Sequence, residues 1–115
     1  MKLLIVVNES PWGSGLALTA YRLARAATHL AGHECAVFFR EDGIYNALPG
    51  QVTDAGTEDL ALSWAALAES HDTRLLLCRS STQRRLIDCP PAPFQESGLT
   101  EMLELMHTVD RVVAF

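Results

Sequence analysis

Short apolar runs, separated by helical or polar stretches, divide the chain. Continuous runs of aliphatic and aromatic residues predict strands that are buried on both faces of a sheet. Four segments have this pattern: Leu3–Val7, Glu34–Phe39, Arg74–Cys78 and Asp110–Phe115. A fifth strand near Phe94 would complete the sheet, but few residues there indicate it.

Between these runs, apolar residues recur at three- and four-residue steps, which predicts helices with one buried face. The first helix is expected from about Ser14 to Ala31, with Gly32 as its stop. Its expected apolar stripe is Leu16, Ala20, Leu23, Ala27 and Leu30. The second helix opens at Thr57, a suitable N-cap. Its expected stripe is Leu60, Trp64 and Leu67.

Two further helices are expected after the third strand. A short one runs from Ser80 to about Ile87, and a last one begins at Ser97 or Thr100. The residues of the last helix expected to face inward are Leu99, Met102, Leu103 and Met106. The long connection from Arg40 to Gly56 is of a length that is often functional in a compact domain.

Strands that alternate with helices predict a parallel sheet covered on both sides, because right-handed crossovers place helices on its faces. A length of 115 residues is enough for one domain and too short for two. The expected fold is therefore a single α/β domain over residues 1–115. It is flavodoxin-like, with three α/β/α layers and a mostly parallel sheet of four to five strands.

Composition narrows the classes of partner. A formal net charge of −5 argues against nucleic-acid binding, which needs a basic surface to displace counterions from phosphates. Apolar residues make up 49% of the chain, which is high for a small soluble monomer and favours an oligomer. No apolar run approaches membrane-spanning length, and the first apolar run is too short for a signal peptide. We expect a soluble cytoplasmic protein.

Cys78 is the strongest candidate for chemistry. It ends an apolar run and precedes a segment that starts a helix, so it is expected at the carboxyl end of a strand, where active sites of α/β sheets collect. A helix N-terminus and nearby cations favour the thiolate, which is the reactive form. The cations are Arg79, Arg84 and Arg85. The alternatives are an inert core cysteine and arginines that only keep the surface soluble.

The other two cysteines are less informative. Cys35 falls within an apolar strand and is expected in the core. Cys89 lies in a proline-rich loop and is either a possible second thiol or a residue with no role. Three irregularly spaced cysteines form neither a disulfide framework nor a zinc pattern, so no metal is expected. Gly13 and Gly15 lack the third glycine of a dinucleotide loop.

Several short stretches, in this order and at these spacings, resemble the DsrE/TusD-type sulfur-transfer family over essentially the whole chain. They are Pro11-Trp12-Gly13, Ala31-Gly32-His33-Glu34, Val37-Phe38-Phe39, Asp42-Gly43-Ile44-Tyr45-Asn46-Ala47, Leu77-Cys78 with Arg84-Arg85, and Asp110-Arg111-Val112-Val113-Ala114-Phe115. The chain departs from the family after the cysteine, where Arg79 to Gln83 replaces a more alanine-rich stretch, and it also carries Cys89.

The resemblance implies a sulfurtransferase that carries sulfur as a persulfide on Cys78. Family members work in oligomers of related subunits and pass sulfur between a donor and an acceptor protein. They serve tRNA 2-thiouridine formation or sulfur oxidation. The exchange needs no cofactor, because sulfur is both nucleophile and cargo. Tyr45 and Asn46, in the loop after the second strand, are expected near Cys78 as a pocket or partner surface, or else only to pack and turn the chain.

Two other functions stay open at this stage. One is a non-catalytic subunit that fills a place in a sulfur-relay complex while a related subunit carries sulfur. The other is a small flavodoxin-like module that binds a nucleotide or flavin.

Overall fold

A computed structural model describes residues 1–12, 15–48, 59–71, 73–85 and 90–115. They form an α/β domain around one sheet. The strands are β1 (Lys2–Val7), β2 (Glu34–Phe39), β3 (Arg74–Cys78), β4 (Phe94–Ser97) and β5 (Arg111–Ala114). The helices are α1 (Leu16–Thr28), the 3-10 helix η1 (Glu41–Ala47), α2 (Leu60–His71), α3 (Arg79–Arg84) and α4 (Leu99–Thr108).

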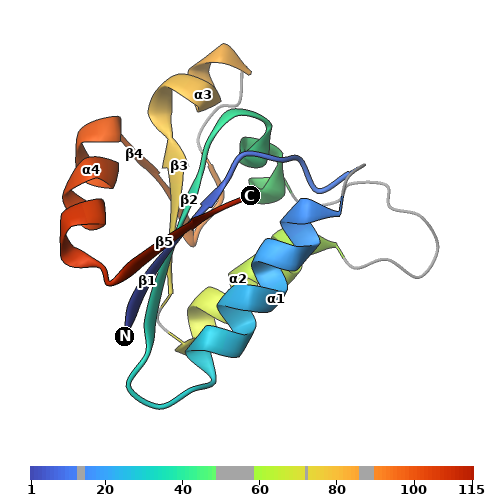
Figure 1. The fold of residues 1–115 in the computed structure, drawn as a ribbon. Coiled ribbons are helices and arrows are strands. Elements are labelled where there is room, and N and C mark those ends of the chain that lie inside the picture. Colours follow the sequence, from blue (N-terminus) through green and yellow to red (C-terminus); the bar gives the residue numbers. More distant parts are fainter. Residues whose placement is uncertain (13–14, 49–58, 72, 86–89) are drawn as a thin grey trace.

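All neighbouring strands pair in parallel, in the order β4-β3-β2-β1-β5. From β1 to β3 the chain moves in one direction across the sheet, and α1 and α2 lie on one face. It then returns from β4 to the far edge at β5, so the same right-handed crossover rule puts α4 on the opposite face. Figure 1 shows α1 and α2 together on one side of the sheet and α4 on the other. The expected three-layer α/β fold is confirmed.

The core has two parts because the sheet is apolar on both faces. Under α1 and α2, a large cluster includes Ile5, Phe39 and Trp64, all fully buried. On the α4 face, a smaller cluster includes Phe38, Cys78 and Met102. The continuous apolar runs in the sequence follow from this arrangement, since successive strand residues point to opposite, equally dry faces.

The strand predictions are confirmed, including the weakly indicated strand at Phe94. The stripe of α2 is also confirmed, since Leu60, Trp64 and Leu67 are buried. The predicted N-cap at Thr57 lies outside the described residues. The left-handed backbone of Gly32, with φ 79°, fits its expected place after the first helix.

Two stripes were predicted correctly only in part. In α1, Ala20 is buried and Leu23 and Ala27 pack against the core as expected, whereas Leu16 and Leu30 are exposed. Ala17 and Ala24 are buried instead, because small alanines let this helix approach the sheet closely.

In α4 the expectation fails for Leu99 and Leu103, which are 43% and 55% exposed, while Met102 is buried and Leu105 and Met106 pack against the core. The helical period is confirmed, but the side of α4 that packs on the sheet carries Met102, Leu105 and Met106, and a second apolar side with Leu99 and Leu103 stays uncovered.

Candidate functional site

Cys78 is the last residue of β3 and the N-cap of α3, at the carboxyl edge of the sheet. Its side chain shares the α4 face with Leu76 and Phe38. Thr82 fastens the turn, since its hydroxyl donates to the Cys78 carbonyl oxygen at 2.9 Å. The expected place of this residue, between a buried strand and a short helix, is therefore the observed one.

Cys78 is only 2% exposed, but its thiol has polar neighbours. Its Sγ lies 3.3 Å from the Ser80 hydroxyl oxygen. Desolvation raises the pKa of the Cys78 thiol, but hydrogen bonds from the side chains and backbones of Ser80 and Ser81 more than offset this, so the net pKa is lowered. The Cys78 thiol is therefore more acidic than an ordinary cysteine, although the residue is buried.

Ser81 also ties this site to the segment after β2. It is fully buried, and its Oγ accepts a hydrogen bond from the Glu41 backbone N–H at 3.0 Å. A hydroxyl that accepts from Glu41 still has its own proton to donate, and the sulfur is an available acceptor. The start of η1 is thus held beside α3, as expected of the long connection.

The three arginines after Cys78 all make ion pairs with carboxylates. Arg79 contacts Glu96 at 3.8 Å, Arg84 contacts Glu41 at 3.7 Å, and Arg85 contacts both Glu41 and Asp42, at 3.4 and 2.8 Å. Arg85 is the best buried of them, and its carboxylate partners raise its pKa against the opposing effect of desolvation. The lowered pKa of Cys78 comes from Ser80 and Ser81, and not from these guanidinium groups.

Tyr45 and Asn46 lie at the far end of η1. Asn46 is fully buried, and its amide donates to the carbonyl oxygens of Glu9 and Gly43 and accepts from the Trp64 indole at 3.4 Å. These contacts join η1 to the segment after β1 and to α2. The ring of Tyr45 packs against Trp12 at 5.5 Å between centroids. These are contacts of packed residues, and a pocket or partner role for Tyr45 and Asn46 stays a prediction.

Cys35 is the other described cysteine. It lies in β2 and is 8% exposed, and burial raises the pKa of its thiol to about 12. This core cysteine is protonated at every physiological pH. Cys89 lies outside the described residues, and so the hypothesis of a second thiol there has no structural account.

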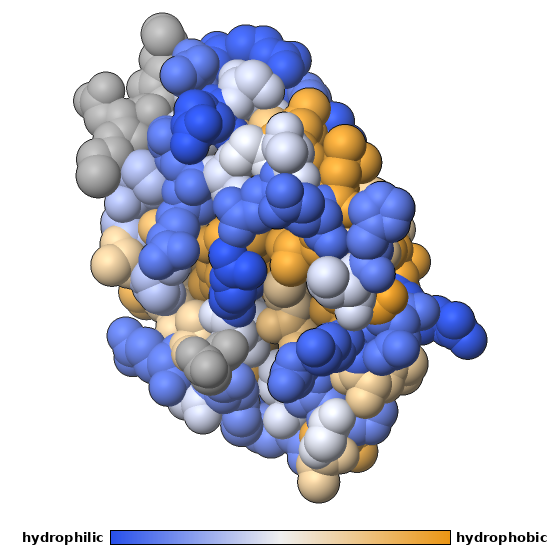
Figure 2. All heavy atoms as spheres, turned by 90° about the vertical axis from the view of Figure 1, so that its left-hand side faces the viewer, coloured by the Kyte–Doolittle hydropathy of each residue, from blue (hydrophilic) through white to orange (hydrophobic). Residues whose placement is uncertain are grey.

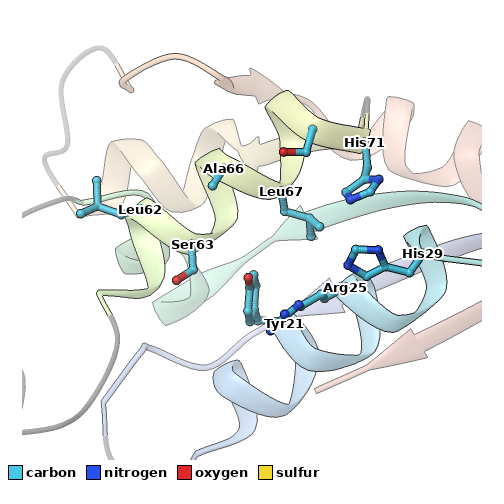
Figure 3. A pocket seen from close by; sticks show the side chains of 9 residues that line it. Tyr21, Arg25, His29, Leu62, Ser63, Ala66, Leu67 and His71 are labelled. Atoms are coloured by element: carbon cyan, nitrogen blue, oxygen red, sulfur yellow. The ribbon is translucent and has the colours of Figure 1, made fainter.

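Of the grooves on the described part of the surface, two of the best formed are not lined by Cys78. The groove in Figure 3 has a volume of about 480 Å³ and lies between α1 and α2. At one end the rings of His29 and His71 meet, with centroids 4.7 Å apart. These histidines end the two helices, so they lie toward the amino edge of the sheet, opposite Cys78. Within the described ranges no group of three or more His, Cys, Asp or Glu residues is arranged to hold a metal.

The sequence predicted Cys78 as the reactive thiol and attributed a lowered pKa to the helix N-terminus and to nearby arginines, whereas Ser80 and Ser81 lower the pKa in the structure. That prediction missed Ser80 and Ser81 as the donors to sulfur. A signal for them was available, because the first residues after a strand-end N-cap direct both backbone N–H groups and short hydroxyl side chains back at that cap.

Comparison with known proteins bears on this site. The model of the DsrE/DsrF-like family matches residues 1–115. A relative named sulfurtransferase TusD homolog, from Vibrio parahaemolyticus, is 35% identical, and the alignment covers 96% of this chain and 95% of the relative. A putative sulfurtransferase DsrE from Allochromatium vinosum is 30% identical over 100% of this chain and 98% of that protein.

A solved structure agrees on the fold. The crystal structure of the ychN protein from E. coli superposes with a TM-score of 0.88 at 24% identity, over 100% of this chain and 99% of that one. No helix in the part of the chain that the structure describes is long and apolar enough to cross a membrane. Together, the family match over the full length and the sulfurtransferase relatives show that this chain belongs to the DsrE/DsrF-like family and support a sulfur-relay role for it.

Proposed function

We propose that this protein is a sulfurtransferase that carries sulfur as a persulfide on Cys78 and passes it between a donor and an acceptor protein. The observation that carries the proposal is the environment of the Cys78 thiol, whose pKa is lowered by hydrogen bonds from Ser80 and Ser81 at the carboxyl edge of the sheet. A thiolate is the species that attacks sulfur. The names of the sulfurtransferase relatives support the same reading.

The reaction is an exchange between a thiolate and a persulfide. The Cys78 thiolate attacks the outer sulfur of a donor R–S–SH, a new S–S bond forms to Cys78, and the donor's S–S bond breaks to release R–S⁻. An acceptor thiolate then attacks the outer sulfur of Cys78–S–SH and restores the Cys78 thiolate. One sulfur atom moves with its proton in each step, so no external oxidant or reductant is needed. The acceptor pathway, toward tRNA thiolation or sulfur oxidation, is set by the partner.

Access to the sulfur is part of the proposal. Next to Cys78 along the chain, Arg79 and Ser80 are exposed, and the side chain of Arg79 contacts Glu96 at 3.8 Å. Exposed ion pairs contribute little to stability. We therefore propose that a side-chain rotation at Ser80 or Arg79 exposes the Cys78 sulfur to a partner at low cost.

The test is the intact mass of the protein after incubation with a cysteine desulfurase, cysteine and a persulfide donor protein. Wild type is expected to gain the mass of one sulfur atom, which dithiothreitol removes. Cys78→Ser abolishes the gain, and Cys35→Ser, the matched control, keeps it. No gain in wild type overturns the proposal and favours the structural-subunit alternative. A yellow protein, or one that retains a nucleotide, would favour the ligand-binding alternative.

We further propose that the protein works as an oligomer with related subunits or further copies of itself. The support is an uncovered apolar area on α4 and the edge strand β5, where Leu99, Leu103 and Val112 are 43%, 55% and 43% exposed. Figure 2 views the α4 side, and apolar surface is exposed there among polar groups. Small domains often bury such residues in subunit contacts.

Light scattering after gel filtration tests this second proposal. Leu103→Glu is expected to reduce the mass of the assembly, because a charge at a subunit contact is costly to bury. Leu62→Glu is the control, since Leu62 is 62% exposed on α2, away from this area. A monomeric wild type, or an assembly that both variants leave intact, would contradict the proposed contact.

A further inference from the structure

Arg40 lies beside Cys78 at the carboxyl edge of the sheet. The last ladder pair between β2 and β3 is Phe39 with Leu77, so Arg40 and Cys78 are the next residues in register. The Arg40 backbone is still extended, with φ −128° and ψ 161°, and its N–H donates to the Val7 carbonyl oxygen at 2.9 Å. Adjacent strands are about 4.8 Å apart. The two residues are therefore direct neighbours across the sheet.

The alternation of side chains puts both residues on the same face. Phe38 belongs to the cluster on the α4 face together with Cys78. Arg40 follows Phe38 by two positions, with the backbone extended between them, so its side chain leaves the sheet on that same face. Among the described arginines, this one shares with Cys78 both its register row and its face.

The guanidinium of Arg40 differs from those of its neighbours in its partners. Arg79, Arg84 and Arg85 each have a carboxylate within 4 Å. Arg40 has no ion pair within the described part of the chain, and its Nε is buried without a hydrogen-bond partner. A buried N–H without an acceptor costs free energy. An acceptor that arrives with the cargo would satisfy it.

The chain after Arg40 is built to hold this position. Glu41 has a φ of 49°, which is uncommon for a residue other than glycine, and its N–H is fixed by the Ser81 hydroxyl. The nearest acids, Glu41 and Asp42, are already paired with Arg84 and Arg85. The charge of Arg40 is therefore left for another anion.

We propose that Arg40 binds the outer sulfur of the Cys78 persulfide through its N–H donors. This inference rests on the proposed function. The loaded Cys78–S–SH releases its proton to solvent, so the negative charge then lies on an atom about 2 Å beyond Sγ and beyond the Ser80 and Ser81 donors. A guanidinium carries five donors in a planar fork and stays charged at all physiological pH values. The serines thus stabilise the empty thiolate, and Arg40 stabilises the loaded persulfide.

The experiment measures sulfur exchange at equilibrium with a small thiol and its persulfide, 2-mercaptoethanol and its hydropersulfide, with the loaded fraction read by mass. Arg40→Gln is expected to lower the exchange constant about tenfold, the usual effect of one charge-assisted hydrogen bond. Arg40→Lys keeps the charge without the fork and loses about threefold. Arg22→Gln, the same change at an exposed position on α1, leaves the constant at the wild-type value.

The outcomes separate the two proposals. If wild type loads and Arg40→Gln exchanges like Arg22→Gln, the role of Arg40 is overturned while persulfide transfer on Cys78 stands. If wild type itself takes up no sulfur, both fall. A purely structural arginine would lower the thermal midpoint and leave the exchange constant unchanged. Where Arg40→Gln does not fold, Arg40→Lys decides, and an exchange constant equal to that of Arg22→Gln overturns the inference.

Discussion

The two described cysteines lie on neighbouring strands of one sheet, and their pKa values are shifted in opposite directions. Both are nearly out of contact with solvent, with Cys78 2% and Cys35 8% exposed. Burial raises the pKa of Cys35 to about 12, whereas hydrogen bonds from Ser80 and Ser81 outweigh desolvation and lower the pKa of Cys78. The exposed fraction therefore does not distinguish the thiol with a raised pKa from the thiol with a lowered pKa.

The difference follows from where each residue lies along its strand. Cys35 is the second residue of β2, near the amino end, where the nearest acceptor of its thiol is a carbonyl oxygen 3.9 Å away. Carbonyl groups accept and cannot stabilise an anion. Cys78 ends β3, where the next residues turn their N–H groups and hydroxyls toward it.

The largest expected effect is in alkylation rates. At pH 7.5, Cys78 should react with iodoacetamide at least about 100-fold faster than Cys35, because only the thiolate reacts and a thiol with a pKa near 12 is almost fully protonated. Mass mapping of labelled peptides over time measures both rates, with Cys89 followed separately. Equal rates at Cys78 and Cys35 would remove the contrast.

Gly43 lets η1 pack closely against the end of β1, near the Cys78 site. A Cβ on Gly43 would lie 2.1 Å from the Val7 carbonyl oxygen, so Gly43→Ala must push η1 off the end of β1. We expect a loss of about 2–4 kcal/mol in the free energy of unfolding and slower alkylation of Cys78. Gly98→Ala is the matched control, since nothing lies within 4 Å of its Cβ. Chemical denaturation that finds the two variants equally stable would contradict this packing.

The raised pKa of Cys35 makes the stability of the protein depend on pH. A thiol whose pKa is raised in the folded state contributes stability that is full below the unfolded pKa and is lost as the pH rises toward the folded value. For Cys35 the loss begins near pH 9 and extends to about pH 12. By pH 10.5 wild type should lose about 2 kcal/mol more than Cys35→Ala. Urea unfolding at pH 8 and pH 10.5 measures it, and parallel losses in both proteins would show that Cys35 is not the cause.

The smallest expected effect is at one hydroxyl. Ser80→Ala removes the donor 3.3 Å from the Cys78 sulfur, which raises the pKa of the thiol and slows its alkylation at pH 7 roughly threefold to tenfold. The rate should recover at pH values above the new pKa. An unchanged pH–rate profile would mean that the backbone N–H groups alone lower the pKa. Ser70→Ala, an exposed serine on α2, is the control.

The strands could be predicted from the sequence because continuous apolar runs mark parallel strands, and the place of Cys78 at the end of a strand could be predicted because it ends one of these runs. The exposure of Leu99 and Leu103 on α4 could not be predicted, because the spacing of apolar residues gives the helical period but does not show which elements cover each side of the helix. Closeness in sequence predicts that the three arginines lie beside the Cys78 sulfur. Their carboxylate partners Glu41, Asp42 and Glu96 belong to other segments, so only the fold reveals those pairs.

Arg40 could not be predicted from the sequence either, because it lies far from Cys78 along the chain and no motif contains both residues. It becomes a neighbour only through the parallel register of β2 and β3. A register is fixed by the whole sheet and by the connections between its strands. The first polar residue after a buried strand is the position to examine once a candidate nucleophile is placed at the end of the adjacent strand.

The most direct test of persulfide transfer on Cys78 is to locate the acquired sulfur. Wild-type protein is incubated with a persulfide donor, its persulfides are trapped by alkylation, and peptides containing each of the three cysteines are compared by mass. The extra sulfur is predicted on Cys78, with none on Cys35. Sulfur found on Cys35 or Cys89 instead of Cys78 would contradict the account.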